Sequence, residues 1–304
     1  MSGAVSQVRG YLSVMAAATL WGISGVVAKS LFNRRIEPWT LIEIRLTGAF
    51  AVLLLVLWLR GHALRVHRHQ LARLGLLGVV MMTTQFLYYF TISVTDVSTG
   101  IFLQYTAPVF VALYGRAVER EELGALKIAA IALAVVGSYF LVAGGTGIRV
   151  HPLGLTTGVL SAVMFGVYAV LGRGRVRQVG STTSLLYALG AGALVWSAVV
   201  PPWRAYAGHG PAEWALFGYI VVFATILPFG LFLAGLRTIS SSMASLTASV
   251  EPVVASAAAF LILGERLTAA QILGGLAIAA AVVLIQVADI RVAVARMELP
   301  PAPD

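Results

Sequence analysis

The stretch WTLIEIRLTGAFAVLLLVLWL, residues 39–59, is long and apolar enough to cross a membrane as a single helix. A helix needs about 20 predominantly apolar residues to span a hydrocarbon core of ~30 Å. Such runs recur along the chain, in which 59% of the 304 residues are hydrophobic and only 11% are charged. So few charges cannot cover a surface that faces water. We therefore expect an all-α integral membrane protein, because the runs are continuously apolar and a transmembrane barrel would alternate.

Outward from this stretch, the sequence predicts ten transmembrane helices joined by short connections. They are expected at residues 11–32, 39–59, 71–94, 97–118, 125–143, 153–172, 182–200, 214–236, 240–263 and 267–289. If the N-terminus is cytoplasmic, the inside segments hold fourteen of the twenty-one Lys and Arg residues. This excess favours both termini in the cytoplasm. Orientation in the membrane therefore accounts for the net charge of +9.

Several function classes lack the residues they need. The chain has no cysteine, which excludes thiolate nucleophiles and cysteine-ligated metal sites, and it has no Gly-x-x-x-x-Gly-Lys-Ser/Thr loop for ATP. The charge pattern shows no basic groove with stacking aromatics, so no nucleic-acid partner is expected. His62, His67 and His69 lie in a basic loop that suits anionic lipid better than a metal ion. We predict a protein that is no enzyme and holds no cofactor or metal.

The two halves of the chain align at a constant offset of 144 residues. Trp21-Gly22 aligns with Phe165-Gly166, Pro108 with Pro252, and Glu121 with Glu265. We predict a first five-helix repeat over residues 1–148, a second over 149–291, and a cytoplasmic tail over 292–304. Because five is odd, the second repeat begins on the opposite side of the membrane and is inverted. Inverted repeats favour alternating access to a site near the midplane.

Four short segments carry a family resemblance: Leu20-Trp21-Gly22, Tyr105-Thr106-Ala107-Pro108, Glu251-Pro252-Val253 and Gly264-Glu265. Over nearly the whole chain, the sequence resembles the drug/metabolite transporter superfamily, specifically its EamA-type members. One departure is Phe165-Gly166, where the second repeat often carries Trp-Gly. The resemblance implies a ten-helix, two-repeat exporter of amino acids, related metabolites or drugs in the bacterial inner membrane.

Glu251 is the most informative single position, because an ionised carboxylate inside a membrane span costs roughly 2.5–3.5 kcal/mol on insertion scales. The functional interpretation is a site for a substrate amine or a proton, next to Pro252, which frees a backbone carbonyl. The structural alternative is an ion pair, or a carboxylate held by backbone and hydroxyls such as that of Thr247.

Lys29, Glu43 and Arg45 lie towards the outer ends of the first two helices, where long side chains could reach the interface. Glu43 and Arg45 are two residues apart and so point to different faces. Arg45 is deep enough to meet Glu251 or a substrate carboxylate, and interfacial anchoring is the alternative. Lys29 is a further candidate for ion pairing, with anchoring preferred.

Aromatic and polar residues recur at spacings that place them on one helix face. The candidate substrate-binding residues are Trp21, Gln85, Tyr88, Tyr89, Tyr105, Tyr168 and Glu251, with Ser24, Gln104 and Phe165 in the same set. Rings with hydroxyl and amide groups suit a zwitterion or a modest amphipath better than a polyphosphate. The alternative is that these residues serve interfaces and helix packing.

Three midhelix prolines, Pro108, Pro228 and Pro252, are candidate hinges because each removes an N–H donor from its helix. A fixed bend that improves packing is the alternative. Glu121 and Glu265 are expected at helix-terminal loops, and Thr268 with Gln271 forms a predicted capping box for the last helix.

The sequence therefore predicts a secondary or facilitative transporter, multi-pass in the bacterial inner membrane, that exports amino acids or related metabolites. The expected partners are a small-molecule substrate and the lipid bilayer, with the protein a monomer or homodimer. Efflux of cationic amphipaths is the main alternative, and a flippase or channel is a weaker one.

Overall fold

The computed structural model describes residues 2–62, 65–95, 97–117, 124–146, 151–263 and 267–298, and these residues form helices and connecting turns without a strand. In the first half the helices are α1 (Ser2–Asn33), α2 (Pro38–Leu59), α3 (Arg68–Val94), α4 (Val97–Gln104), α5 (Ala107–Ala117) and α6 (Ala125–Thr146). In the second half they are α7 (Pro152–Val179), α8 (Ser181–Trp196), α9 (Pro202–Ala205), α10 (Pro211–Val221), the π-helix η1 (Val222–Ile226), α11 (Leu227–Gly235), α12 (Ser241–Ala248), α13 (Glu251–Leu263) and α14 (Ala269–Glu298).

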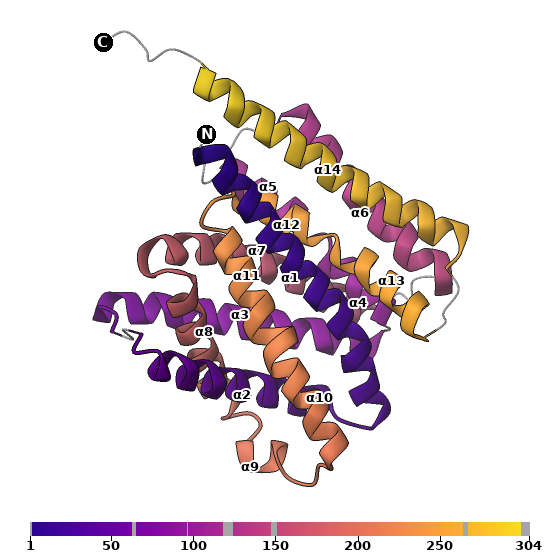
Figure 1. The fold of residues 1–304 in the computed structure, drawn as a ribbon. Helices are drawn as coiled ribbons and strands as arrows, with labels where there is room; N and C mark the ends of the chain where they lie inside the picture. Colours follow the sequence, from indigo (N-terminus) through magenta and orange to yellow (C-terminus); the bar gives the residue numbers. More distant parts are fainter. Residues whose placement is uncertain are drawn as a thin grey trace.

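Seven helical stretches among the described residues are long and apolar enough to cross a membrane. They begin at Val5, Pro38, Arg68, Ala125, Pro152, Pro211 and Ala269. The start of α1 and the end of α14 lie at the same end of the bundle (Figure 1). The chain is therefore an all-helical, multi-pass membrane protein.

Two of the expected continuous helices are instead broken into two segments. Residues 97–117 form α4 and α5, with a turn at Tyr105 and Thr106. Residues 241–263 form α12 and α13, with a turn at Ser249 and Val250. Each second segment has a proline at its second residue, Pro108 or Pro252. Because proline has no N–H, it cannot donate to the carbonyl four residues earlier, at Gln104 or Ala248. The two prolines therefore mark full interruptions of the helix, where a bend was expected.

The two breaks occupy equivalent places in the two halves of the chain. α4 and α12 begin at residues 97 and 241 and end at 104 and 248, and the helices that follow begin at 107 and 251. Each pair of positions differs by 144, the offset found in the sequence. The same backbone interruption therefore occurs once in each half.

The third proline follows a different distortion. Pro228 is the second residue of α11, directly after the π-helical turn η1. A proline at this point cannot form the usual bond to the carbonyl of Ala224, and a π-turn is a common way to absorb that loss. The expected kink at Pro228 is therefore a local widening of the helix, and it leaves the Ala224 carbonyl available to another donor.

Small residues let the helices approach closely. A Cβ on Gly137 of α6 would lie 2.8 Å from the carbonyl oxygen of Gly274 in α14, and one on Gly48 of α2 would lie 2.9 Å from Val221. Contacts this short leave no room for a side chain, as is usual for helix pairs in membranes. Close packing of this kind holds the helices at fixed positions relative to one another.

Candidate substrate cavity

A cavity of about 350 Å³ lies between helices of both halves of the chain. Most of the candidate binding, ion-pair and hinge residues line it: Trp21, Ser24, Arg45, Gln85, Tyr88, Tyr89, Gln104, Tyr105, Pro108, Phe165, Tyr168, Glu251 and Pro252. Pro228 does not line the cavity, and the side chain of Lys29 lies outside the described part of the structure. Helices far apart in sequence thus bring most of the predicted residues to one space.

Arg45 is held in the bundle interior, with only 4% of its surface exposed. Its Nε donates to Thr225 Oγ1 at 3.2 Å, its Nη1 to the Tyr89 hydroxyl at 3.1 Å, and its Nη2 to the Ala224 carbonyl at 3.0 Å. The Ala224 carbonyl is the one that Pro228 leaves without its usual donor. The guanidinium also lies 5.9 Å from the centre of the Phe229 ring, within cation–π range. Interfacial anchoring, the alternative for Arg45, is therefore wrong.

Gln85 completes the shell around Arg45. The hydrogen-bond network orients its amide with the carbonyl oxygen towards the guanidinium, where it accepts from Nη1 at 2.9 Å and from Nη2 at 3.2 Å. Gln85 and Tyr89 are one turn apart on α3 and so present their polar atoms to the same neighbour. The four-residue spacing of Gln85 and Tyr89 thus lets both side chains bind the buried guanidinium of Arg45.

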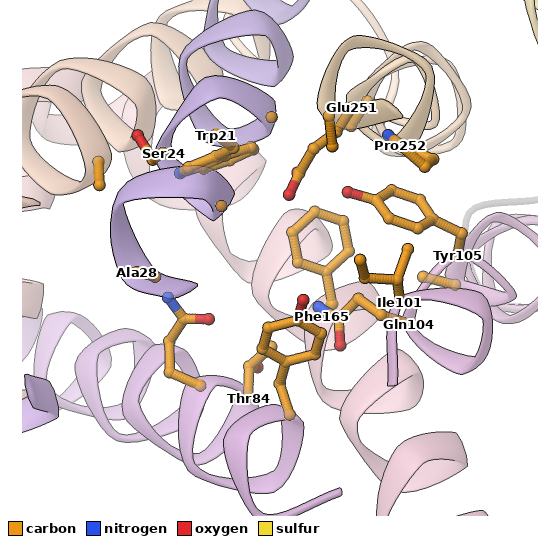
Figure 2. A pocket seen from close by; sticks show the side chains of 18 of the residues that line it. Trp21, Ser24, Ala28, Thr84, Ile101, Gln104, Tyr105, Phe165, Glu251 and Pro252 are labelled. Carbon is orange, nitrogen blue, oxygen red and sulfur yellow. The ribbon is translucent and has the colours of Figure 1, made fainter. Parts of the chain in front are cut away.

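Glu251 is the first residue of α13 and directly follows the break at Ser249 and Val250. Its carboxylate and the hydroxyl of Tyr105 point towards one another in the cavity (Figure 2). Tyr105 lies in the equivalent break of the first half, so the two interruptions face each other across the cavity. A helix start is also a favourable place for a negative charge.

Gly22 brings α1 against this second break. A Cβ at Gly22 would lie 2.8 Å from the carbonyl oxygen of Glu251 and 3.0 Å from the backbone nitrogen of Ala255. Only glycine fits such an approach. The Trp21-Gly22 pair therefore has two roles: the glycine admits the backbone of α13, and Trp21 lies beside Glu251 on the cavity wall (Figure 2).

Arg45 and Glu251 both line the cavity, where opposite charges attract one another more strongly than in water. Within the part of the chain that the structure describes, they do not form a direct ion pair. The cavity therefore offers one fixed positive and one negative group with space between them. A solute that carries both charges matches this arrangement.

Trp21 of α1 and rings from the second half form the apolar wall. Trp21 meets Phe229 edge-on with centroids 5.0 Å apart, and Tyr168 stacks on Phe232 at 6.1 Å. Phe165 and Phe232 are also in contact, at 5.5 Å. Tyr168 is almost fully buried, and its hydroxyl has no hydrogen-bond partner among the described residues. This wall offers contact area and little polar recognition.

Glu43 is fully buried inside the bundle and accepts a hydrogen bond from Ser197 Oγ at 2.7 Å, on the face of α2 away from Arg45. Its expected position near the membrane interface stays a prediction. Thr247 does not hold Glu251, because its hydroxyl has no hydrogen-bond partner in the described structure.

Other expectations fare differently. The predicted capping box is confirmed: the Thr268 N–H donates to Gln271 Oε1 at 2.9 Å and the Gln271 N–H to Thr268 Oγ1 at 3.3 Å. Glu121 and Glu265 lie outside the described residues. Among the described residues, no group of three His, Cys, Asp or Glu side chains could hold a metal ion.

Sequence reasoning missed residues that support the cavity from behind. Thr225 was not singled out, although it accepts from Arg45 and donates to the Ile220 carbonyl at 2.9 Å. The Ser161 hydroxyl lies within hydrogen-bonding distance of the Thr84 carbonyl and of the Gln104 side-chain oxygen, and can donate its one proton to either. A lone Ser or Thr in a membrane helix usually bonds its own backbone, so nothing in the sequence distinguishes these two.

The sequence model of the EamA-like transporter family matches this chain twice, over residues 8–143 and 152–287. The chain belongs to the EamA-like transporter family. The resemblance seen in the short motifs is thereby confirmed. The starts and the ends of the two matched stretches both differ by 144 residues, as do the two helix breaks.

Curated relatives of this EamA family member are named as transporters. It is 28% identical over 287 residues to an uncharacterized inner membrane transporter, YicL, of Salmonella typhimurium, covering 91% of this chain and 95% of that protein. It is 26% identical over 272 residues to the threonine/homoserine exporter RhtA of Escherichia coli K12, with 88% of each chain covered. A solved crystal structure superposes with a TM-score of 0.78 at 17% identity, over 93% of this chain and 98% of the other. The last similarity concerns the fold alone.

Proposed function

We propose that this EamA family protein exports amino acids or related small metabolites across the bacterial inner membrane by alternating access. The observation that carries the proposal is the pair of opposite charges, Arg45 and Glu251, on the wall of one central cavity. An amino acid presents a carboxylate and an ammonium group to such a pair. Similarity to a threonine/homoserine exporter over most of the chain supports the same substrate class.

In the proposed arrangement the chain crosses the membrane ten times, as two inverted five-helix repeats with both termini in the cytoplasm. The broken runs α4–α5 and α12–α13, together with the short α8, supply the three crossings beyond the seven long helical stretches. Rocking of the halves about the facing breaks opens the cavity to either side. Transport is driven by the substrate gradient or by protons, and the chain performs no chemical conversion of its cargo.

The test is counterflow into proteoliposomes that contain the purified protein. Vesicles are loaded with each of the standard amino acids or with L-homoserine, and uptake of the labelled compound is measured beside protein-free vesicles. We expect accelerated exchange for a subset of amino acids. Exchange of none of them, with a hydrophobic cation exchanged instead, would contradict the proposal.

Efflux of cationic amphipaths is the second candidate, favoured by the aromatic wall of Trp21, Phe165 and Phe229 beside the Glu251 carboxylate. A cation of this kind needs Glu251 and the rings but has no use for Arg45. Counterflow with Glu251→Gln and with Arg45→Gln therefore separates the two candidates. We expect both substitutions to abolish exchange of amino acids, whereas a cation pump would tolerate the second.

A further inference from the structure

All five N–H donors of Arg45 have partners within the protein itself. Nε donates to the Thr225 hydroxyl. Nη1 donates to the Tyr89 hydroxyl and the Gln85 side-chain oxygen, and Nη2 donates to the Ala224 carbonyl and the same Gln85 oxygen. Five is the full donor count of a guanidinium. A substrate carboxylate can therefore bind Arg45 only by displacing one of these partners.

The partners differ in how easily they can leave. The Ala224 carbonyl is backbone, and the Thr225 hydroxyl is tied to the Ile220 carbonyl at 2.9 Å. The amide of Gln85 sits at the end of a flexible side chain that itself lines the cavity. Because it has three side-chain torsions, it can rotate aside without moving the backbone of α3.

Gln85 occupies a side of the guanidinium that a carboxylate can also bind. Its oxygen accepts from both terminal nitrogens of the guanidinium, at 2.9 and 3.2 Å. This is the side of the guanidinium at which carboxylates bind with two parallel bonds, and a charged acceptor binds there more strongly than a neutral amide. A carboxylate in the cavity is thus a better ligand for the same two donors.

We propose that Gln85 occupies the site of the substrate's carboxylate on Arg45 and is displaced when substrate binds. The substrate's ammonium group then faces Glu251 and the hydroxyl of Tyr105. This inference rests on the proposed function and narrows it: the cargo must carry a free carboxylate together with a free amine, and molecules with a blocked carboxyl group are excluded. Gln85 therefore lowers the affinity for substrate, because it competes with the substrate's carboxylate for Arg45.

The proposal makes affinity and stability move in opposite directions. Gln85→Ala removes the competitor, and water in the cavity can reach the donors it leaves. Ligand-free stability then falls, while the affinity for substrate rises roughly tenfold. Gln85→Glu places a permanent carboxylate against Arg45. The ligand-free protein becomes more stable, while the affinity for substrate falls at least about tenfold.

The experiment measures Kd by calorimetry and the ligand-free Tm for the purified full-length protein and its variants. The probes are the twenty standard L-amino acids, L-homoserine, and the carboxamide of whichever of these binds best. Gln104→Ala is the matched control, because Gln104 also lines the cavity but accepts from Ser161 instead of Arg45. It is expected not to lower Kd.

The expected result is a lower Kd with a lower Tm for Gln85→Ala, the reverse for Gln85→Glu, and weak binding of the carboxamide. If Gln85→Ala weakens binding together with stability, Gln85 is merely structural and the inference is overturned. If the carboxamide binds as tightly as the parent amino acid, Arg45 does not read the carboxylate and the inference also fails. If the wild-type protein binds no amino acid at all, the proposed function fails first.

Discussion

At the scale of single residues, the cavity joins one rigid positive group to one negative group at a break in a helix. Arg45 is immobilised by partners on α3 and η1, and Glu251 is placed by the start of α13. Rigid placement of these side chains matters because less conformational entropy is then lost when a substrate binds.

Arg45→Lys tests whether the fork of the guanidinium is required in addition to its charge. A lysine keeps the positive charge, but its three donors share one nitrogen, whereas Thr225, Tyr89 and Ala224 are bound by three different nitrogens of the guanidinium. We expect Kd for the transported amino acid to rise about tenfold or more. Arg204→Lys, at the exposed helix α9, is the control and should bind normally. Unchanged binding by the Arg45 variant would contradict the assignment.

The sequence predicted the cavity residues better than their partners. Gln85, Tyr88 and Tyr89 were identifiable because their spacing puts polar groups on one face of an apolar helix. For Arg45 the sequence showed that it and Glu43 face different ways, and it left open whether Arg45 reaches the bundle interior or anchors at the interface. The partners of the two faces of α2 come from η1 and from the end of α8. The positions of these elements in space cannot be read from a local sequence pattern.

At the scale of elements, the decisive features are the two interruptions at equivalent places in the halves. Neither Tyr105-Thr106 nor Ser249-Val250 is a helix-breaking pair by composition, so the sequence predicted only a bend from the prolines nearby. The break arises because proline removes a donor and the preceding turn reorganises. In the first break, for example, the Thr106 N–H bonds the Leu103 carbonyl at 3.2 Å.

Pro252→Ala tests the break as a moving part. Alanine restores the N–H that can bond the Ala248 carbonyl, which favours a continuous helix through Ser249 and Val250. We expect the counterflow rate to fall at least about tenfold while Kd changes little, as for a variant that impairs a conformational step. Pro211→Ala, at the first residue of α10, removes a proline that interrupts nothing and should transport normally. A normal rate for Pro252→Ala would show that the break plays no part in transport.

Gly137→Ala tests the close contact between α6 and α14. The added methyl would lie 2.8 Å from the Gly274 carbonyl oxygen and 3.0 Å from the Ile278 nitrogen, both backbone atoms that cannot rotate away. We expect the free energy of unfolding to fall by about 1–3 kcal/mol, seen as a lower Tm in detergent. Gly218→Ala is the control, since a Cβ on this exposed residue of α10 meets nothing within 4 Å. Equal Tm values for the two variants would contradict the packing assigned here.

At the scale of the whole molecule, the proposed inverted topology makes a prediction about sidedness. The chain has no cysteine, so a single introduced cysteine is the only thiol that a maleimide can label. With ten crossings and a cytoplasmic N-terminus, Arg204→Cys in α9 should react with a membrane-impermeant maleimide in intact cells. Arg60→Cys, at the end of α2, should react only after the membrane is opened. Labelling of both from the same side would disprove the proposed arrangement.

The equivalent positions of the two helix breaks have a consequence for how the choice of transported solute can change. The break recurs at residues 105–106 and 249–250, yet Glu251 has Ala107 at the matching position and Arg45 has Leu189. The two halves thus share the backbone interruption, whereas Arg45 occurs only in the first half and Glu251 only in the second. Substitutions at residues 45 and 251 should therefore alter which solute the proposed cavity accepts without removing the backbone shape that the two halves have in common.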